Sequence, residues 1–168
     1  EVTKALALSE GRGAIAVNVM KAVSQHAAYV RQACESGAHA IVMGAGLPFD
    51  LPDMAADFPD VALIPILSDA RGVQIVVKKW MRKNRLPDAL ILEAVQATFR
   101  ELGIERERIP LIVAGGVHTH EQMVELLGLG ASAVQLGTAF AVTEEGDAHP
   151  NFTKVLAEAK PDDIVTFI

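Results

Sequence analysis

The chain has 168 residues, of which 51% are hydrophobic and 21% are charged, and its formal net charge is −6. This composition excludes a disordered chain, and the acidic balance argues against nucleic acid or an anionic membrane surface as a partner. No apolar stretch approaches the roughly 18 residues of a membrane span and no leader opens the sequence, so we expect no membrane association. The single cysteine, Cys34, cannot form an internal disulfide, which favours a reducing compartment such as the cytoplasm.

Short apolar runs alternate with helical segments along the chain, a pattern that favours parallel βα units. Helices are predicted over residues 1–9, 24–35, 69–83 and 118–130, with a short helix between residues 49 and 58. The predicted strands are almost entirely apolar, as is typical of a parallel sheet buried on both faces. They cover residues 14–20, 40–43, 63–67, 88–91, 111–114 and 133–136. We therefore predict a single α/β domain over residues 1–168 with the fold of a (β/α)8 TIM barrel.

Two features indicate that the barrel is incomplete. The sequence offers six strands where eight are needed, and it opens with a helical segment rather than a strand. In addition, the predicted strand 88–91 runs into helical sequence with no turn residue between Ile91 and Leu92, whereas the other βα junctions contain Gly, Pro, Asn or Ser. We expect that amino-terminal strands and a loop at Ile91/Leu92 are either deleted or left out of the numbered sequence.

Two strand ends carry glycine, at Gly115-Gly116 and at Gly137-Thr138. In a parallel α/β barrel the loops after the last two strands often form a phosphate site. Glycine lets backbone N–H groups approach a phosphate closely, and the N-terminus of the following helix adds the positive end of its dipole. The alternative is that these glycines only make tight βα turns.

Six stretches, taken together and in order, resemble the nitronate monooxygenase family, formerly called 2-nitropropane dioxygenases, which are FMN-dependent barrels. FMN-dependent enoyl-ACP reductases of the second type share much of this set. The most specific stretches are the Gly-Thr-x-Phe strand end and the Glu-Glu-x-Asp-Ala-His-Pro run that follows it. The six are Ala16-Val17-Asn18-Val19-Met20, Gly44-Ala45-Gly46-Leu47-Pro48, Leu63-Ile64-Pro65-Ile66, Ala114-Gly115-Gly116-Val117, Val134-Gln135-Leu136-Gly137-Thr138 and Thr143 to Pro150.

The resemblance implies that FMN is the cofactor and that its phosphate lies against the two glycine sites. For Asn18 a turn-capping role is an equal alternative, and for Gln135 a satisfied core amide is an equal alternative. His118 and His120, two residues apart, do not share a helix face, so no metal site is expected. The implied cofactor-binding residues are Asn18, Met20, Gly44, Ala45, Gly115, Gly116, Gln135, Gly137 and Thr138.

The resemblance further implies oxidation of alkyl nitronates by O2 to a carbonyl compound and nitrite. In the family a Gly-Gly-His loop follows the strand that corresponds to residues 88–91, and its histidine resembles a catalytic base. That loop is absent after Ile91, so no catalytic residue is assigned. The alternatives are an NAD(P)H-dependent FMN enoyl-ACP reductase, a non-redox phosphate-binding barrel and a non-catalytic interaction domain. The expected partners are a small nitronate and O2, and a homodimer is left open.

Several other residues are expected to have structural or surface roles rather than catalytic ones. Cys34 is expected to be a small apolar filler, and His26 and His39 are expected at the surface. Asp147 and His149 are assigned a structural or substrate-mouth role. The basic residues before Pro87 are expected to form a solvated surface. They are Lys78, Lys79, Arg82, Lys83 and Arg85.

Overall fold

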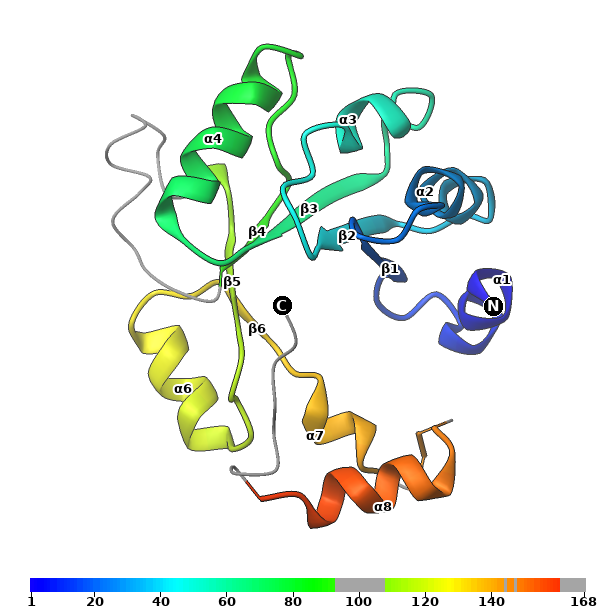
Figure 1. Cartoon of the computed structure of the whole chain (residues 1–168), viewed down its shortest axis with the longest axis vertical. Coiled ribbons are helices and arrows are strands. Elements are labelled where there is room, and N and C mark those ends of the chain that lie inside the picture. Colours follow the sequence, from blue (N-terminus) through cyan, green and yellow to red (C-terminus); the bar gives the residue numbers. More distant parts are fainter. Residues whose placement is uncertain (93–107, 144, 147, 161–168) are drawn as a thin grey trace.

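A computed structural model describes residues 1–92, 108–143, 145–146 and 148–160. Its centre is a sheet of six parallel strands in which each strand pairs only with its neighbours in the chain. The sheet curls into an arc in Figure 1, so the prediction of an incomplete parallel barrel is confirmed. The strands are β1 (Ala16–Met20), β2 (Ala40–Gly44), β3 (Ala62–Leu67), β4 (Leu90–Leu92), β5 (Leu111–Ala114) and β6 (Ala133–Gln135).

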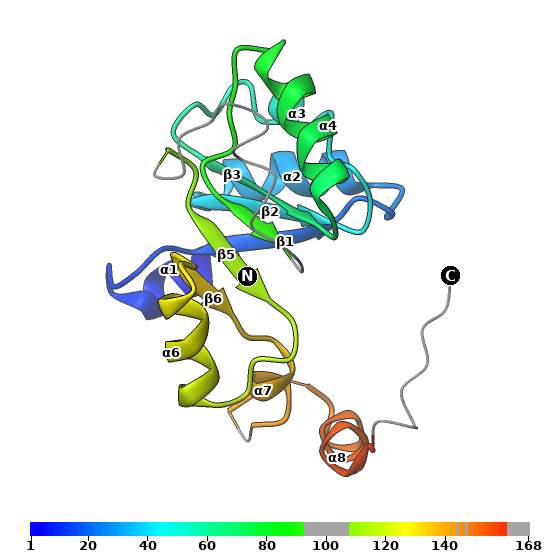
Figure 2. The same cartoon turned by 90° about the vertical axis from the view of Figure 1, so that its left-hand side faces the viewer.

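The helices α2, α4 and α6 lie on the outer side of the curved sheet, whereas α7 and α8 follow β6 (Figure 1). Figure 2 shows α8 lying apart from the strands. The sequence analysis did not predict α7, which is a single turn of four residues, and it overlooked the short apolar stripe of Phe152, Val155 and Leu156 in α8. The helices are α1 (Val2–Ser9), α2 (His26–Glu35), α3 (Leu51–Met54), α4 (Ala70–Met81), α6 (His120–Gly128), α7 (Thr138–Ala141) and α8 (Pro150–Glu158). None of the described helices is long and apolar enough to cross a membrane.

Side chains alternate between the two faces of the first three strands. In β3, Leu63 and Leu67 are buried against the outer helices, whereas Ile64 and Ile66 on the other face are only half-buried. In β1, Val19 belongs to the same buried core while Asn18 and Met20 on either side of it are exposed. The main core therefore lies between the sheet and the outer helices, and the concave face is more open.

Trp80 on α4 is the largest fully buried side chain of this core. The helix begins where the carboxylate of Asp69 accepts a hydrogen bond from Gly72 N at 2.7 Å, a standard N-cap. Cys34 is buried in α2, as expected, and burial raises the pKa of its thiol. By contrast α1, α6, α7 and α8 contain no buried residue. Packing in the described residues is thus concentrated on the first four strands.

Strand β4 extends through Leu92, one residue beyond the predicted end. Ile91 pairs with Ile66 on one side and with Ile112 on the other, and Leu92 continues both ladders. The junction without a turn residue therefore comes after Leu92. This junction, and with it the place where a loop is expected to be missing, involves residues 93–107, which lie outside the described residues.

The basic residues before Pro87 do not form a purely solvated surface, so that expectation was wrong in part. Lys83 Nζ donates to Asp53 at 2.5 Å, which ties the end of α4 to α3. Arg85 donates to Asp88 at 2.5 Å, just before β4. Lys83 and Arg85 lie against the protein because each pairs with an acidic side chain, Asp53 of α3 and Asp88 just before β4 respectively.

Candidate functional site

A cavity of about 250 Å³ lies at the carboxyl ends of β5 and β6. It gathers five of the nine residues that the sequence assigned to cofactor binding. Those five come from the two glycine sites and the strand end between them. The lining residues are Ile66, Ala114, Gly115, Gly116, Val117, His118, Gln135, Gly137 and Thr138.

The three glycines of the cavity face open space. A Cβ built at Gly115, Gly116 or Gly137 would meet no atom within 4 Å. Gly115 and Gly116 have φ of +96° and +66°, which L side chains rarely adopt. The backbone N–H groups of the three glycines donate no hydrogen bond to any other described residue. Exposed, unpaired donors in front of an empty space suit an oxyanion.

The first turn of α6 does not contribute as the sequence suggested. Gln122 Oε1 accepts from His118 N at 2.8 Å and from Thr119 N at 3.1 Å, and Thr119 caps Gln122 N in return. The carboxylate of Glu121 lies in the same turn, and hydrogen bonds from its own backbone and from the Thr119 side chain lower its pKa. These donors are occupied within the helix, and an anionic side chain already sits at its positive end. The short helix α7, whose N-cap is Gly137, has no side-chain cap.

Gln135 behaves as a cavity residue rather than as a satisfied core amide. It lies at the end of β6, lines the cavity and is half-buried. Its side chain makes no hydrogen bond to another residue in the described part of the chain. Gln135 is therefore not a satisfied core amide among the described residues, while a contact with the cofactor stays a prediction.

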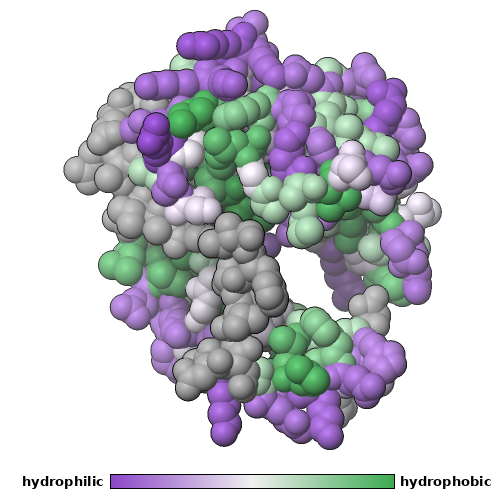
Figure 3. Space-filling view, in the orientation of Figure 1, coloured by the Kyte–Doolittle hydropathy of each residue, from purple (hydrophilic) through white to green (hydrophobic). Residues whose placement is uncertain are grey.

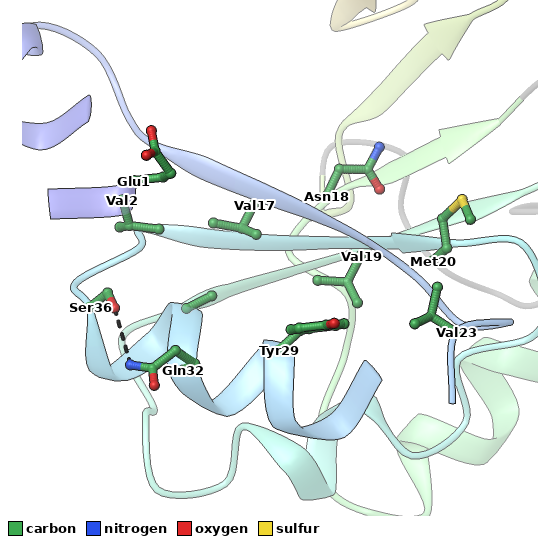
Figure 4. Close-up of a pocket in the computed structure, with 11 residues that line it drawn as sticks. Glu1, Val2, Val17, Asn18, Val19, Met20, Val23, Tyr29, Gln32 and Ser36 are labelled. Atoms are coloured by element: carbon green, nitrogen blue, oxygen red, sulfur yellow. Dashed lines mark hydrogen bonds between the residues drawn. The ribbon is translucent and has the colours of Figure 1, made fainter. Parts of the chain in front are cut away.

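Asn18 and Met20 line a different hollow, of about 440 Å³, along the outer edge of β1 (Figure 4). Figure 4 shows Asn18 pointing away from α2 and Val19 pointing toward it. Asn18 pairs with Val42 in the middle of the ladder and its amide makes no hydrogen bond to a described residue, so it does not cap a turn. In Figure 3 an opening separates the part of the molecule that carries β1–β3 from the part that carries α7 and α8. Seven of the nine predicted cofactor-binding residues thus fall into two groups: five line the glycine cavity, while Asn18 and Met20 line this hollow.

Gly44 and Ala45 lie between these groups, at the carboxyl end of β2. A Cβ at Gly44 would lie 3.0 Å from Ile66 Cβ, so this glycine is needed where β2 and β3 pack. Ala45 has a φ of 55°, an unfavourable conformation for a residue with a side chain. The Ile66 side chain that packs beside Gly44 also lines the glycine cavity, so this one side chain lies between Gly44 and the cavity.

A charged cluster that the sequence analysis missed lies beside the loop between β2 and α3, residues 45–50. Lys21 Nζ is 2.5 Å from Asp50 Oδ2 and 2.9 Å from His26 Nε2. The His26 side chain is 18% exposed, so the expectation of a surface histidine was wrong. A lysine directly after the end of an apolar strand is the signal that indicates a functional position at this edge of the sheet.

The remaining histidines have local roles. His149 caps α8, since its Nδ1 accepts from Asn151 N at 3.2 Å, which confirms a structural role; Asp147 lies outside the described residues. His39 Nδ1 accepts from Ile15 N at 2.8 Å ahead of β1. His118 lines the glycine cavity, and no catalytic residue is assigned.

A curled sheet of parallel strands with helices on its outer side defines an incomplete α/β barrel of the TIM-barrel class. The chain belongs to the nitronate monooxygenase family, since the model of that family matches residues 8–167.

Relatives with a curated description support this assignment. A probable nitronate monooxygenase of Bacillus subtilis is 40% identical over 103 residues, which cover 58% of this chain and 30% of that protein. FabK from Thermotoga maritima superposes with a TM-score of 0.69 at 23% identity, over 94% of this chain and 52% of that one. A mandelate oxidase variant with an FMN adduct gives a TM-score of 0.54 at 15% identity, over 90% and 57% of the two chains. The chain therefore spans about a third to a half of the length of these proteins.

Proposed function

We propose that the chain binds FMN with its phosphate in the cavity at Gly115, Gly116 and Gly137. The observation that carries the proposal is the empty space in front of these three glycines, together with their unpaired N–H groups. Three backbone donors, the Thr138 hydroxyl and a helix start are the donor set that a phosphate dianion requires. The residues present therefore fit the group.

The remaining predicted residues are proposed to meet the rest of the cofactor. Gln135 lies in the phosphate cavity with a free amide, while Asn18 and Met20 stand on the open face of β1. Gly44 and Ala45 lie on the path between them, beside Ile66. Bound FMN would supply the electron transfer, and the protein residues would orient it and limit the access of water.

The proposed reaction is the oxidation of an alkyl nitronate by O2 to a carbonyl compound and nitrite. The support is the family assignment and the name of the Bacillus relative. A nitronate is already deprotonated, so the reaction needs no protein base, whereas a neutral nitroalkane does. Because the sequence lacks the Gly-Gly-His loop whose histidine resembles that base, we expect nitronates to be turned over in preference to nitroalkanes. Robust nitroalkane turnover by these 168 residues would contradict this expectation.

The test of the binding proposal compares FMN with riboflavin, which lacks the phosphate. The chain should bind FMN more tightly than riboflavin, measured by quenching of flavin fluorescence. Gly137→Ala is the sharpest variant, because φ at Gly137 is −123° and the added Cβ meets no protein atom. The folded protein should tolerate it, while a phosphate against the N–H would not. The variant should lose preference for FMN and keep its affinity for riboflavin. Equal affinity of the unaltered chain for both ligands would overturn the proposal.

A second candidate function is NAD(P)H-dependent reduction of an enoyl thioester, favoured by the superposition on FabK over 94% of the chain. Anaerobic reduction of the bound flavin by NADH, compared with reduction by an alkyl nitronate, separates the two. A chain that binds inorganic phosphate but no flavin would instead indicate a non-redox phosphate-binding barrel. A cytoplasmic location remains a prediction from the single cysteine, and a homodimer is left open.

A further inference from the structure

The loop between β2 and α3 is fastened on its outer side by α4 and the turn that follows it. Trp80 Nε1 donates to the carbonyl oxygen of Pro48 at 3.0 Å, and Lys83 Nζ donates to that of Phe49 at 2.7 Å. These two contacts fix the second half of the loop against the outer layer of the molecule. They do not reach its first half, which contains Ala45 and its unfavourable φ.

Lys21 spans the loop from the side of β1. Its backbone N–H donates to Gly44 O at 2.7 Å, where the loop begins. Its aliphatic stem passes Gly46 so closely that a Cβ there would lie 3.2 Å from Lys21 Cγ. Its ammonium group reaches Asp50, where the loop ends. One residue thus contacts the beginning of the loop through its backbone, and the middle and the end through its side chain.

The neighbours of the ammonium group hold it in this position. His26 Nδ1 is 2.8 Å from Val23 O, which makes Nδ1 the donor and leaves Nε2 to accept from Lys21. Asp50 Oδ1 is buried and has no hydrogen-bond partner among the described residues. The Asp50 carboxylate is therefore balanced mainly by Lys21, and removing the ammonium would leave a partly buried charge unpaired.

We propose that Lys21 is a positioning residue that holds the β2–α3 loop in the conformation that brings Gly44 and Ala45 to the cofactor. The part of the inference that concerns ligand affinity rests on the proposed FMN site. The part that concerns the order of the loop does not. Lys21 itself lines neither the glycine cavity nor the hollow along β1.

The test uses the full chain and three substitutions. Lys21→Met keeps the stem that packs on Gly46 and removes the charge, while Lys21→Arg keeps a charge. Lys78→Met removes a lysine charge from the exposed surface of α4 and serves as the matched control. In the ligand-free protein, the amides of Phe49 and Leu51 donate backbone hydrogen bonds to Leu47 O and Pro48 O. Their hydrogen exchange should accelerate about tenfold in Lys21→Met, and only slightly in Lys21→Arg or the control.

Ligand affinity gives the second measurement. FMN and riboflavin should both bind about three- to tenfold more weakly to Lys21→Met, because ordering the loop is then part of binding. The ratio of the two affinities should stay unchanged, in contrast to Gly137→Ala, which alters that ratio. Partial recovery in Lys21→Arg would separate positioning by charge from simple loss of packing.

The outcomes distinguish the two proposals. If the unaltered chain binds neither flavin, the proposed function fails, and the exchange measurement still decides whether Lys21 orders the loop. If Lys21→Met leaves exchange and affinity as they were, the inference on Lys21 is wrong while the FMN site stands. If circular dichroism shows that Lys21→Met does not fold, Asp50→Asn breaks the same pair from the other side with little change in shape. Unchanged loop exchange in that variant would likewise overturn the inference.

Discussion

The indole Nε1 of Trp80 donates a hydrogen bond to the carbonyl oxygen of Pro48 at 3.0 Å, and both residues are almost completely buried. The bond joins α4 to the loop that follows β2, across the main core. It satisfies two polar groups that have no access to water, so its loss is costly. It also determines how close the outer helix layer lies to the carboxyl end of the sheet.

Trp80→Phe should lower the free energy of unfolding by about 1–3 kcal/mol, because Pro48 O is left buried without a donor and part of the indole volume is vacated. Urea denaturation followed by far-ultraviolet circular dichroism measures it. Trp80 is the sole tryptophan of the sequence, so its fluorescence cannot report on the variant. A change of less than a few tenths of a kcal/mol would mean that the bond contributes nothing in solution.

Gly44→Ala should destabilise the fold by about 1–3 kcal/mol, since its Cβ would lie 3.0 Å from Ile66 Cβ and the two strands would have to move apart. Gly137→Ala is the control, with an expected change within about 0.5 kcal/mol because its Cβ meets open space. Thermal or urea unfolding of the pair separates a glycine needed for packing from one that leaves room for a ligand. Equal losses in the two variants would contradict this distinction.

Stability at low pH should depend on Asp50. Burial opposes ionisation of this carboxyl group, but the hydrogen bond and the charge of Lys21, a backbone hydrogen bond and the neighbouring His26 side chain lower its pKa below the ordinary 3.8. A carboxyl group with a lowered pKa in the folded state contributes its full stability above that ordinary value, and the contribution is lost as the pH falls below it.

The free energy of unfolding should therefore fall between about pH 4.5 and pH 2.5, and less steeply in Asp50→Asn than in the unaltered chain. Urea titrations at several pH values give both curves. Asp53→Asn, at the other lysine–aspartate contact of this region, is the matched control. Parallel curves for the unaltered chain and Asp50→Asn would show that the Lys21 pair does not act in solution.

Amide exchange should differ strongly between the two ends of the domain. Amides of β2 and α4, which carry the buried core, should be the best protected, while those of α8 should exchange near the rate of an open helix. The physical reason is that α8 contains no buried residue, and both Phe152 and Val155 are more than half exposed. Equal protection of α8 and α4 would show that another surface covers α8 in solution.

The parallel βα order was predictable because each strand is a short, mostly apolar run, and every strand but β4 is closed by a turn residue. The six predicted strands differ from the observed ones by only a few residues at their ends. The caps of α4 and α6 were equally readable, since Asp69 and Thr119 stand just before periodic apolar segments. Helix α7 was missed because four residues are too short to show a period, and α8 was missed because its apolar stripe of Phe152, Val155 and Leu156 covers little more than one turn.

The candidate site was predictable where backbone geometry decides it. Gly115, Gly116 and Gly137 stand at strand ends in the sequence and share a cavity in the structure. The Lys21–Asp50 contact was not predictable from the sequence, because the two residues are 29 positions apart and only the parallel pairing of β1 with β2 brings them together. Sequence spacing also does not reveal that the Ile66 side chain occupies the space beside Gly44, whereas the space beside Gly137 is open.

The neighbour-by-neighbour strand order has a consequence for how the domain forms. Paired residues of adjacent strands lie only 21 to 25 positions apart, from Ala16 with Ala40 to Ile112 with Ala133. Each new strand can therefore dock onto its predecessor as soon as one further βα unit leaves the ribosome, without waiting for a distant segment. The glycine cradle, which needs β5 and β6, would then assemble after β1–β4, on a scaffold already consolidated around Trp80.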